Sequence, residues 1–156
     1  MSRRTSAVGI TGIAGLVLGC VGTGTTHPAA INVTESNRAI VSDFVDLMYR
    51  QKDVRAAFMK HVVADYVQHN PNIADGRDAA ITALAPMFSR PGATFEVKRV
   101  LVDGNLAAVH LRGRPSPEDP GGAVVDLFRL ENGKIVEHWD VLQPIPETSV
   151  NPHPMF

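Results

Sequence analysis

The chain has very little cysteine, and its single thiol, Cys20, leaves no possibility of an internal disulfide. A folded domain must therefore be held together by packing of its apolar residues, which make up 44% of the 156 residues. An excess of basic charge is also missing, because 15 Lys and Arg residues stand against 16 Asp and Glu residues. Nucleic-acid binding needs a basic field that neutralises phosphates, so this class of partner is excluded.

The sequence signatures of metal, phosphate and nucleotide binding are absent as well. The six histidines form no HxxxH or HxH pattern, and no CxxC occurs. A Gly-rich phosphate loop, a dinucleotide fingerprint and a GxSxG elbow are likewise missing. We therefore expect neither a metal nor an organic cofactor. Because Cys20 lies in the N-terminal segment, thiol catalysis is excluded for the folded domain.

The N-terminal segment is typical of an export signal. Two early arginines precede an uncharged stretch, 7–18, which is too short to span a bilayer. The sequence VLGC that follows resembles the lipobox of bacterial lipoproteins, in which the cysteine is acylated. We expect an exported, cell-envelope protein anchored to the membrane by a lipid on Cys20, with an ordinary secretory signal as the alternative. The expected divisions are a signal peptide, a flexible tether, one folded domain and a C-terminal tail: 1–19, 20–35, 36–145 and 146–156.

Hydrophobic periodicity predicts helices first and strands afterwards, which is an α+β order. Asp53 is the expected N-cap of the second helix, and a slip in alternation near Arg99 predicts a β-bulge. A pocket between the helices and a curved antiparallel sheet is the natural cavity. The expected helices cover 36–51, a segment after Asp53 and 77–89; the expected strands cover 64–70, 94–102, 106–112, 123–130 and 134–142.

Asp126 is the first candidate for chemistry. Its same-face neighbours on a strand include Val124 and Phe128, so the carboxyl group should be buried among apolar side chains. Desolvation of this kind is one way in which proteins tune a carboxyl group for general acid or base work. The alternative is a structural aspartate paired with an arginine such as Arg99 or Arg112.

Histidines supply the second set of candidates. His110 lies on the strand before that of Asp126, and adjacent strands would let the carboxylate orient the imidazole. The alternative places His110 on the solvent face. His69 lies with Tyr66 and Asn70 just before Pro71, where these side chains either line a pocket or tie down a turn.

His138 and Asp140 share one face of the last strand, and Trp139 points to the other face. Such a His–Asp pair binds a metal, shuttles protons or forms a partly exposed surface ladder. For Asp140 we favour the exposed ladder, with Trp139 as the core anchor, and the role of His138 stays open.

Four segments together resemble the SnoaL-like polyketide cyclase family, within the nuclear transport factor 2-like superfamily. The resemblance covers residues 36 to about 145, and it rests on YVQHNP, DGR, DLFRL and GKIVEHWD at 66–71, 75–77, 126–130 and 133–140. It implies a curved antiparallel sheet wrapped by N-terminal helices into a cone with an apolar pocket. It also implies dimerisation through the outer sheet face, and chemistry without metal or organic cofactor.

The same resemblance implies that Asp126 is the general acid/base of an intramolecular aldol closure, assisted by His110. With His69 as a further catalytic candidate, the expected pocket residues are Tyr66, Asn70, Phe128, His138 and Trp139. The expected function is cofactor-independent acid/base chemistry, of cyclase, isomerase or dehydratase type, on a small apolar carbonyl compound. The alternatives are a ligand-binding lipoprotein without catalysis and a dimeric protein-interaction module.

Overall fold

The computed structural model describes residues 33–156. The expected signal peptide, Cys20 and most of the expected tether lie outside the described residues. Among the described helices, none has the length and apolar character needed to cross a membrane.

The N-terminal half consists of α1 (Val33–Val45), the π-helical turn η1 (Asp46–Arg50), α2 (Val54–His61) and, after one strand, α3 (Arg77–Phe88). The first expected helix, 36–51, is present but begins earlier, at Val33, and changes its hydrogen-bonding pattern over its last turn. A π-helical turn adds a residue to the turn and shifts the side chains that follow. Asp53 is confirmed as the cap of α2, because its carboxylate accepts a hydrogen bond from the Ala56 amide.

One five-stranded sheet forms the second layer, in the order β1-β5-β4-β3-β2. Its strands are β1 (Val62–Gln68), β2 (Thr94–Asp103), β3 (Leu106–Arg114), β4 (Gly122–Glu131) and β5 (Lys134–Pro144). The four C-terminal strands form antiparallel neighbours, whereas β1 runs parallel to β5 at the sheet edge. This parallel pair departs from the expected all-antiparallel sheet, and it brings the end of β1 beside the last strand.

The turns and the bend in the sheet follow the expected local chemistry. The pairing of β2 with β3 shifts between Val97 and Arg99, which confirms a bulge in β2. In the β4–β5 turn, Asn132 and Gly133 both have positive φ, 49° and 75°. Two consecutive positive values define a type I′ hairpin turn, for which Asn-Gly is the preferred sequence.

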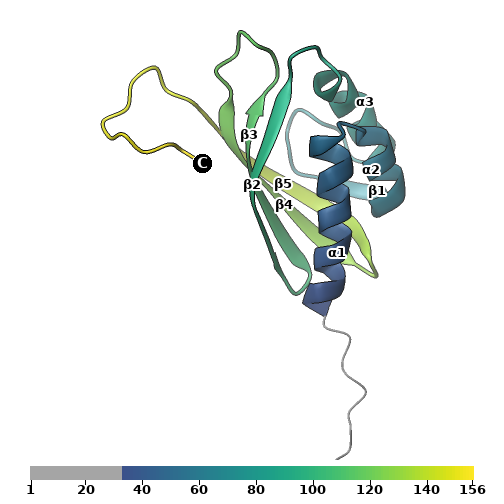
Figure 1. Cartoon of the computed structure of the whole chain (residues 1–156). Coiled ribbons are helices and arrows are strands. Elements are labelled where there is room, and N and C mark those ends of the chain that lie inside the picture. The colour runs from purple at the N-terminus through teal and green to yellow at the C-terminus, as the bar shows by residue number, and fades with distance from the viewer. Residues whose placement is uncertain (1–32) are drawn as a thin grey trace, which may run out of the picture.

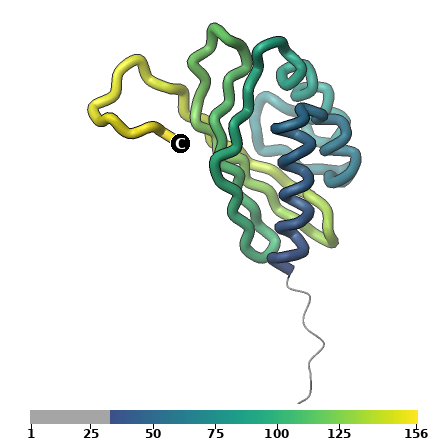
Figure 2. Tube along the Cα trace, viewed as in Figure 1, coloured from purple at the N-terminus to yellow at the C-terminus, as the bar shows by residue number. Residues whose placement is uncertain are grey.

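The helices cover one face of the curved sheet, and Figures 1 and 2 show α1 and α2 packed across it, whereas no helix of residues 33–156 packs on the opposite face. An aromatic cluster joins the layers, since the ring of Phe44 in α1 lies 5.2 Å from that of Phe128 in β4 and 5.7 Å from that of Phe58 in α2. The helix-covered face is called the inner face below, and the other is the outer face. The tail after β5 loops out and returns so that the Phe156 ring lies 5.4 Å from the Arg112 guanidinium.

Candidate functional site

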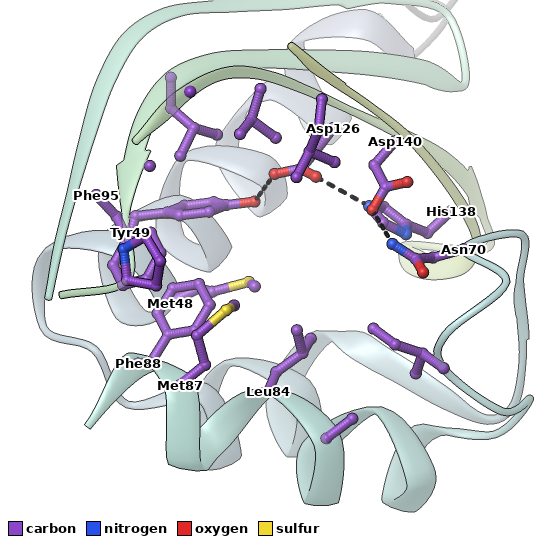
Figure 3. A pocket seen from close by; sticks show the side chains of 18 of the residues that line it. Met48, Tyr49, Asn70, Leu84, Met87, Phe88, Phe95, Asp126, His138 and Asp140 are labelled. Carbon is purple, nitrogen blue, oxygen red and sulfur yellow. Dashed lines mark hydrogen bonds and ion pairs between the residues drawn. The ribbon is translucent and has the colours of Figure 1, made fainter. Parts of the chain in front are cut away.

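A cavity of about 550 Å³ lies between the helices and the inner face (Figure 3). Most of its wall is apolar, and the polar side chains gather on the sheet side, where Asn70, Asp126, His138 and Asp140 point inward. A concave apolar pocket with a few convergent polar groups is the usual form of a small-molecule site. The apolar wall includes Met48, Ile73, Leu84, Met87, Phe88, Phe95, Leu111 and Val124.

The register of β4 and β5 brings together Asp126, His138 and Asp140, which are called the polar corner below. Asp126 lies directly opposite Asp140, and Phe128 lies directly opposite His138. Residues that face each other across a ladder share one face of the sheet, so all four side chains point to the inner face. Asp140 is half-buried and lines the cavity, so the expectation that it belongs to a partly exposed surface ladder is wrong.

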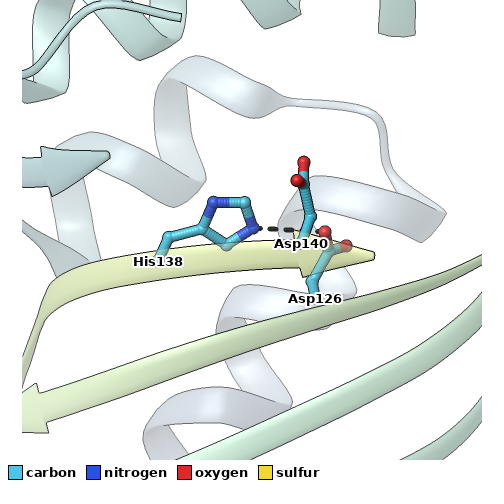
Figure 4. Close-up of side chains that lie close together, drawn as sticks. All are labelled: Asp126, His138 and Asp140. Atoms are coloured by element: carbon cyan, nitrogen blue, oxygen red, sulfur yellow. Dashed lines mark hydrogen bonds and ion pairs between the residues drawn. The ribbon is translucent and has the colours of Figure 1, made fainter. Parts of the chain in front are cut away.

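Asp126 is buried, with 9% of its surface exposed, and both carboxylate oxygens have partners. The hydroxyl of Tyr49 donates to Oδ2 at 2.6 Å, and Nε2 of His138 lies 3.2 Å from Oδ1. Figure 4 shows the His138 ring aimed at this carboxylate. Among residues 33–156, the ion-pair partner of Asp126 is His138 and not an arginine. The alternative of a structural Asp–Arg pair is therefore wrong.

The other ring nitrogen of His138, Nδ1, carries a hydrogen in every arrangement that the hydrogen bonds allow. Nδ1 lies 2.9 Å from Oε1 of Gln68, and the backbone amide of Asn70 donates to the same oxygen at 2.9 Å. Because a backbone N–H only donates, this atom of Gln68 must be the amide oxygen, and Nδ1 of His138 must carry a hydrogen. The contact between Nε2 and Asp126 then holds a single proton, borne either by the imidazole or by the carboxyl group.

Asp140 forms the other half of the polar corner. Its Oδ2 accepts a hydrogen bond of 2.5 Å from Nδ2 of Asn70, at the end of the β1 segment. The parallel pairing of β1 with β5 sets Gln68 opposite His138 and so delivers both amide side chains to the corner. One loop thus orients both the histidine and the second carboxylate.

The two tyrosines of the chain, Tyr49 and Tyr66, both line the cavity. Burial, followed by the charges of Asp126 and Asp140, raises the pKa of each phenol well above 10.0. Both hydroxyls consequently remain hydrogen-bond donors throughout the neutral range.

His110 does not meet Asp126. In the β3–β4 ladder Val109 is the residue opposite Asp126, and His110 lies opposite Val125 on the outer face. There Nδ1 of His110 accepts a hydrogen bond of 3.0 Å from the Arg99 guanidinium. The expected pairing of His110 with Asp126 differs from the observed register by one residue. A shift of one residue moves a side chain to the opposite face of the sheet.

His69 and Trp139 also lie away from the cavity. Their rings stack at 4.7 Å with an angle of 9°, and Nε2 of His69 lies 2.8 Å from Oε1 of Glu137. Trp139 is opposite Leu127 on the outer face, so it is not the core anchor that the sequence suggested. The remaining expected pocket residues do line the cavity, namely Tyr66, Asn70, Phe128 and His138.

Two residues of the site, Tyr49 and Gln68, are not among those predicted from the sequence. Tyr49 lies in η1, where the π-helical turn displaces it from simple helical spacing, and no pattern in the sequence indicates such a turn. Gln68 lies within the segment that carries the family resemblance, and its position between Tyr66 and His69 was the available signal.

The polar corner also has the composition of a metal site, although the sequence patterns predict none. One nitrogen of His138 and one oxygen each of Asp126 and Asp140 lie within 4.8 Å of one another. An imidazole and two carboxylates suit a divalent ion. Bonds of about 2.1 Å would separate two ligand atoms by at most roughly 4.2 Å, so at the widest spacing the side chains would have to move inward.

Comparisons with solved structures find the same fold at low identity. A nuclear transport factor 2-like protein of unknown function from Mesorhizobium loti is 23% identical, with a TM-score of 0.62 over 70% of this chain and 93% of that one. A candidate ketosteroid isomerase from Kribbella flavida is 19% identical, with a TM-score of 0.63 over 78% and 88%. A candidate SnoaL-like polyketide cyclase from Jannaschia sp. is 20% identical, with a TM-score of 0.59 over 70% and 87%.

No curated protein sequence matches the chain. The SnoaL-like domain family, in contrast, matches residues 41–138, a range that begins in α1 and ends at His138. This range is more than half of the 156 residues and includes Asp126 and His138, and the chain belongs to the SnoaL-like domain family.

Proposed function

We propose that this SnoaL-like domain is a cofactor-independent acid/base enzyme of aldol cyclase, isomerase or dehydratase type, acting on a small apolar carbonyl compound. The observation that carries the proposal is the Asp126–His138 pair, which holds one proton at the wall of an apolar cavity. A carboxylate in such surroundings is available to take a proton from carbon.

In the proposed reaction, Asp126 removes a proton from the carbon next to the carbonyl group. The C–H electron pair moves toward the carbonyl oxygen and gives an enolate, while the proton resides on the carboxyl group. Tyr66 supports this step, because its buried hydroxyl lines the cavity and its one hydrogen bond within the described chain is received from Gln68 at 3.5 Å. Its own proton is therefore free to stabilise the enolate oxygen.

The enolate then has three outcomes, which correspond to the three reaction types. Return of the proton from Asp126 to another carbon gives isomerisation. Transfer of that proton to a hydroxyl group on the adjacent carbon lets the group leave as water while the enolate electron pair forms a C=C bond, which is dehydration. Attack of the enolate carbon on a second carbonyl closes a ring, and the new alkoxide takes the proton from Asp126. The cationic form of His138 would hold Asp126 ionised between turnovers.

The test is deuterium exchange at the carbon next to the carbonyl of 2-tetralone, followed by NMR in heavy water. The full chain is expected to accelerate exchange, and Asp126→Asn is expected to lower the rate by roughly 100-fold. The amide oxygen of Asn still accepts from Tyr49, so the variant should keep its fold. Asp65→Asn removes an equal charge from an exposed position of β1 outside the cavity lining and serves as the control.

Absence of any acceleration by the unmodified chain, or full activity in Asp126→Asn, would overturn the catalytic proposal. Binding of 2-tetralone without exchange would favour the ligand-binding alternative. In that case the cavity holds a small molecule without turnover.

We also propose the cellular setting that the N-terminal pattern suggests. The chain is exported to the bacterial cell envelope, residues 1–19 are removed and Cys20 carries the lipid. Cys20→Ser should release the protein from the membrane fraction in its native host, whereas unchanged partitioning would contradict the lipid anchor.

A homodimer through the outer face is proposed from the apolar residues that this face exposes. Leu101 and Val141 have 65% and 62% of their surfaces exposed. Leu101 shares one ladder row with Leu127 and Trp139, and Val141 is two residues after Trp139 on β5. Val141→Asp should convert a dimer into a monomer in sedimentation experiments. The same change at Val150 in the exposed tail should leave the dimer intact, and a wild-type monomer would contradict the proposal.

A further inference from the structure

The cavity has an unbalanced charge. Aspartates supply its acidic groups, and within residues 33–156 no lysine or arginine contributes to the lining. One of these aspartates, Asp119 at the rim, is turned toward the backbone, where it accepts a hydrogen bond of 2.7 Å from the Gly121 amide. The other two form the polar corner with His138.

The net charge of the corner does not depend on where its proton sits. If His138 is an imidazolium, its positive charge offsets Asp126 and leaves Asp140 negative. If the proton is on Asp126, then His138 is neutral and Asp140 is again negative. Because Gln68 fixes the other ring nitrogen as a donor in both cases, an ionised Asp140 would leave the corner with one net negative charge.

Asp140 has no cationic partner within salt-bridge distance in the described part of the chain. Its hydrogen bond comes from the neutral amide of Asn70, and it lies directly opposite Asp126 in the β4–β5 ladder. The proton shared by His138 and Asp126 offsets one of the two opposed carboxylates, so Asp140 is the one left without a counter-charge, and a cation beside Asp140 would balance it. The cavity that opens beside this pair, with apolar walls, has room for an organic ligand to supply that cation.

We infer that the cavity selects an apolar molecule bearing an ammonium group, which lies against Asp140, and that it rejects carboxylates and phosphates. The apolar body of the ligand would lie on the wall formed by Met48, Leu84, Met87 and Phe88 (Figure 3). This makes Asp140 the residue that determines specificity.

The inference rests on the proposed function only for its consequence in the reaction. One oxygen each of Asp126 and Asp140 lie within 4.8 Å of each other. An ammonium nitrogen on Asp140 would therefore place a carbon only a few bonds away at Asp126. The substrate class that follows is an apolar amino-carbonyl compound, with the amine close to the carbon that loses its proton.

The test uses three matched naphthalene probes: 2-(aminomethyl)naphthalene, 2-(hydroxymethyl)naphthalene and 2-naphthoate. Their affinities for the full chain are measured by calorimetry at pH 7 with EDTA present, so that no metal ion supplies the positive charge. The amine should bind most tightly, the alcohol less tightly and the carboxylate at least roughly tenfold more weakly than the amine.

Asp140→Asn should weaken binding of the amine by roughly tenfold and should narrow the difference between amine and carboxylate. Asp65→Asn, the exposed control, should leave all three affinities unchanged. Undetectable binding of the amine, or a carboxylate that binds as tightly as the amine, overturns the inference without using any variant. An unchanged amine affinity in folded Asp140→Asn overturns it as well.

These outcomes are separable from those of the exchange experiment. A preference for the amine together with no exchange on 2-tetralone would retain the cation-selective pocket and reject the enzyme. Exchange that depends on Asp126, together with tighter binding of the carboxylate than of the amine, would retain the enzyme and reject the cation-selective pocket.

Discussion

Neighbouring residues on the same strands point to opposite faces of the sheet, and the two faces carry different kinds of side chain. On the inner face, Val109, Asp126 and Asp140 form a row across β3, β4 and β5. On the outer face, the adjacent row contains His110, Val125 and Val141. The inner row carries buried charge, whereas the outer row carries exposed apolar surface and a histidine bound to an arginine.

The histidines of the two faces also differ in which ring nitrogen carries a hydrogen. His138 on the inner face must carry a hydrogen on Nδ1, because the amide oxygen of Gln68 faces that atom. His110 on the outer face must lack one there, because the Arg99 guanidinium donates to it. The comparison shows that the position in the ladder, and not the residue type, decides which histidine is available for acid/base work.

The largest effect expected from this contrast concerns stability. Phe128 is 2% exposed and packs on Phe44, so Phe128→Ala should lower the free energy of unfolding by about 3–5 kcal/mol. Its sequence neighbour Leu127 is 37% exposed on the outer face, and Leu127→Ala in the monomeric Val141→Asp background should lower the free energy of unfolding by less than about 1 kcal/mol. Urea denaturation measures both, and equal losses would mean that the outer face is as well packed as the inner face.

The tyrosines provide a prediction at alkaline pH. The folded-state pKa values of Tyr49 and Tyr66 lie above the ordinary 10.0, so their contribution to stability is complete below pH 10 and is lost as the pH rises further. Because the chain has no other tyrosine, phenolate absorbance should stay flat through pH 10 and rise only with unfolding. A simple titration of either phenol near pH 10 in the folded protein would contradict the buried site.

The smallest expected effect concerns the outer face. Hydrogen bonds from His69 and Arg129 hold the pKa of Glu137 below 4.5. The stability that Glu137 contributes is therefore complete above pH 4.5 and is lost as the pH falls through the lower folded-state value. Glu137→Gln should slightly lower the melting temperature at neutral pH and leave it unchanged in acid; an equal decrease at both pH values would show that charge is not involved.

The sequence was sufficient for the elements and for the inward direction of Asp126. Local chemistry indicates the Asp53 cap, the Asn-Gly turn and the bulge near Arg99, since each depends on neighbouring residues only. The apolar neighbours of Asp126 likewise predict its burial, which the structure shows.

The partners of Asp126 were beyond sequence reasoning, because they depend on long-range register. A register of one residue decides between Val109 and His110, and only the parallel pairing of β1 with β5 brings Gln68 to His138. The sequence favours Trp139 as the core anchor because large apolar side chains are usually buried. In this sheet the inner face borders a cavity and accepts His138, while Trp139 faces outward.

On the inner face, one proton lies between Asp126 and His138, and Gln68 fixes the imidazole. Proton–nitrogen NMR spectra of the imidazole rings test this arrangement most directly, with His138→Gln and His110→Gln variants assigning the signals. We expect a protonated Nδ1 on His138 and an unprotonated Nδ1 on neutral His110. An unprotonated Nδ1 on His138 in the folded protein would contradict it.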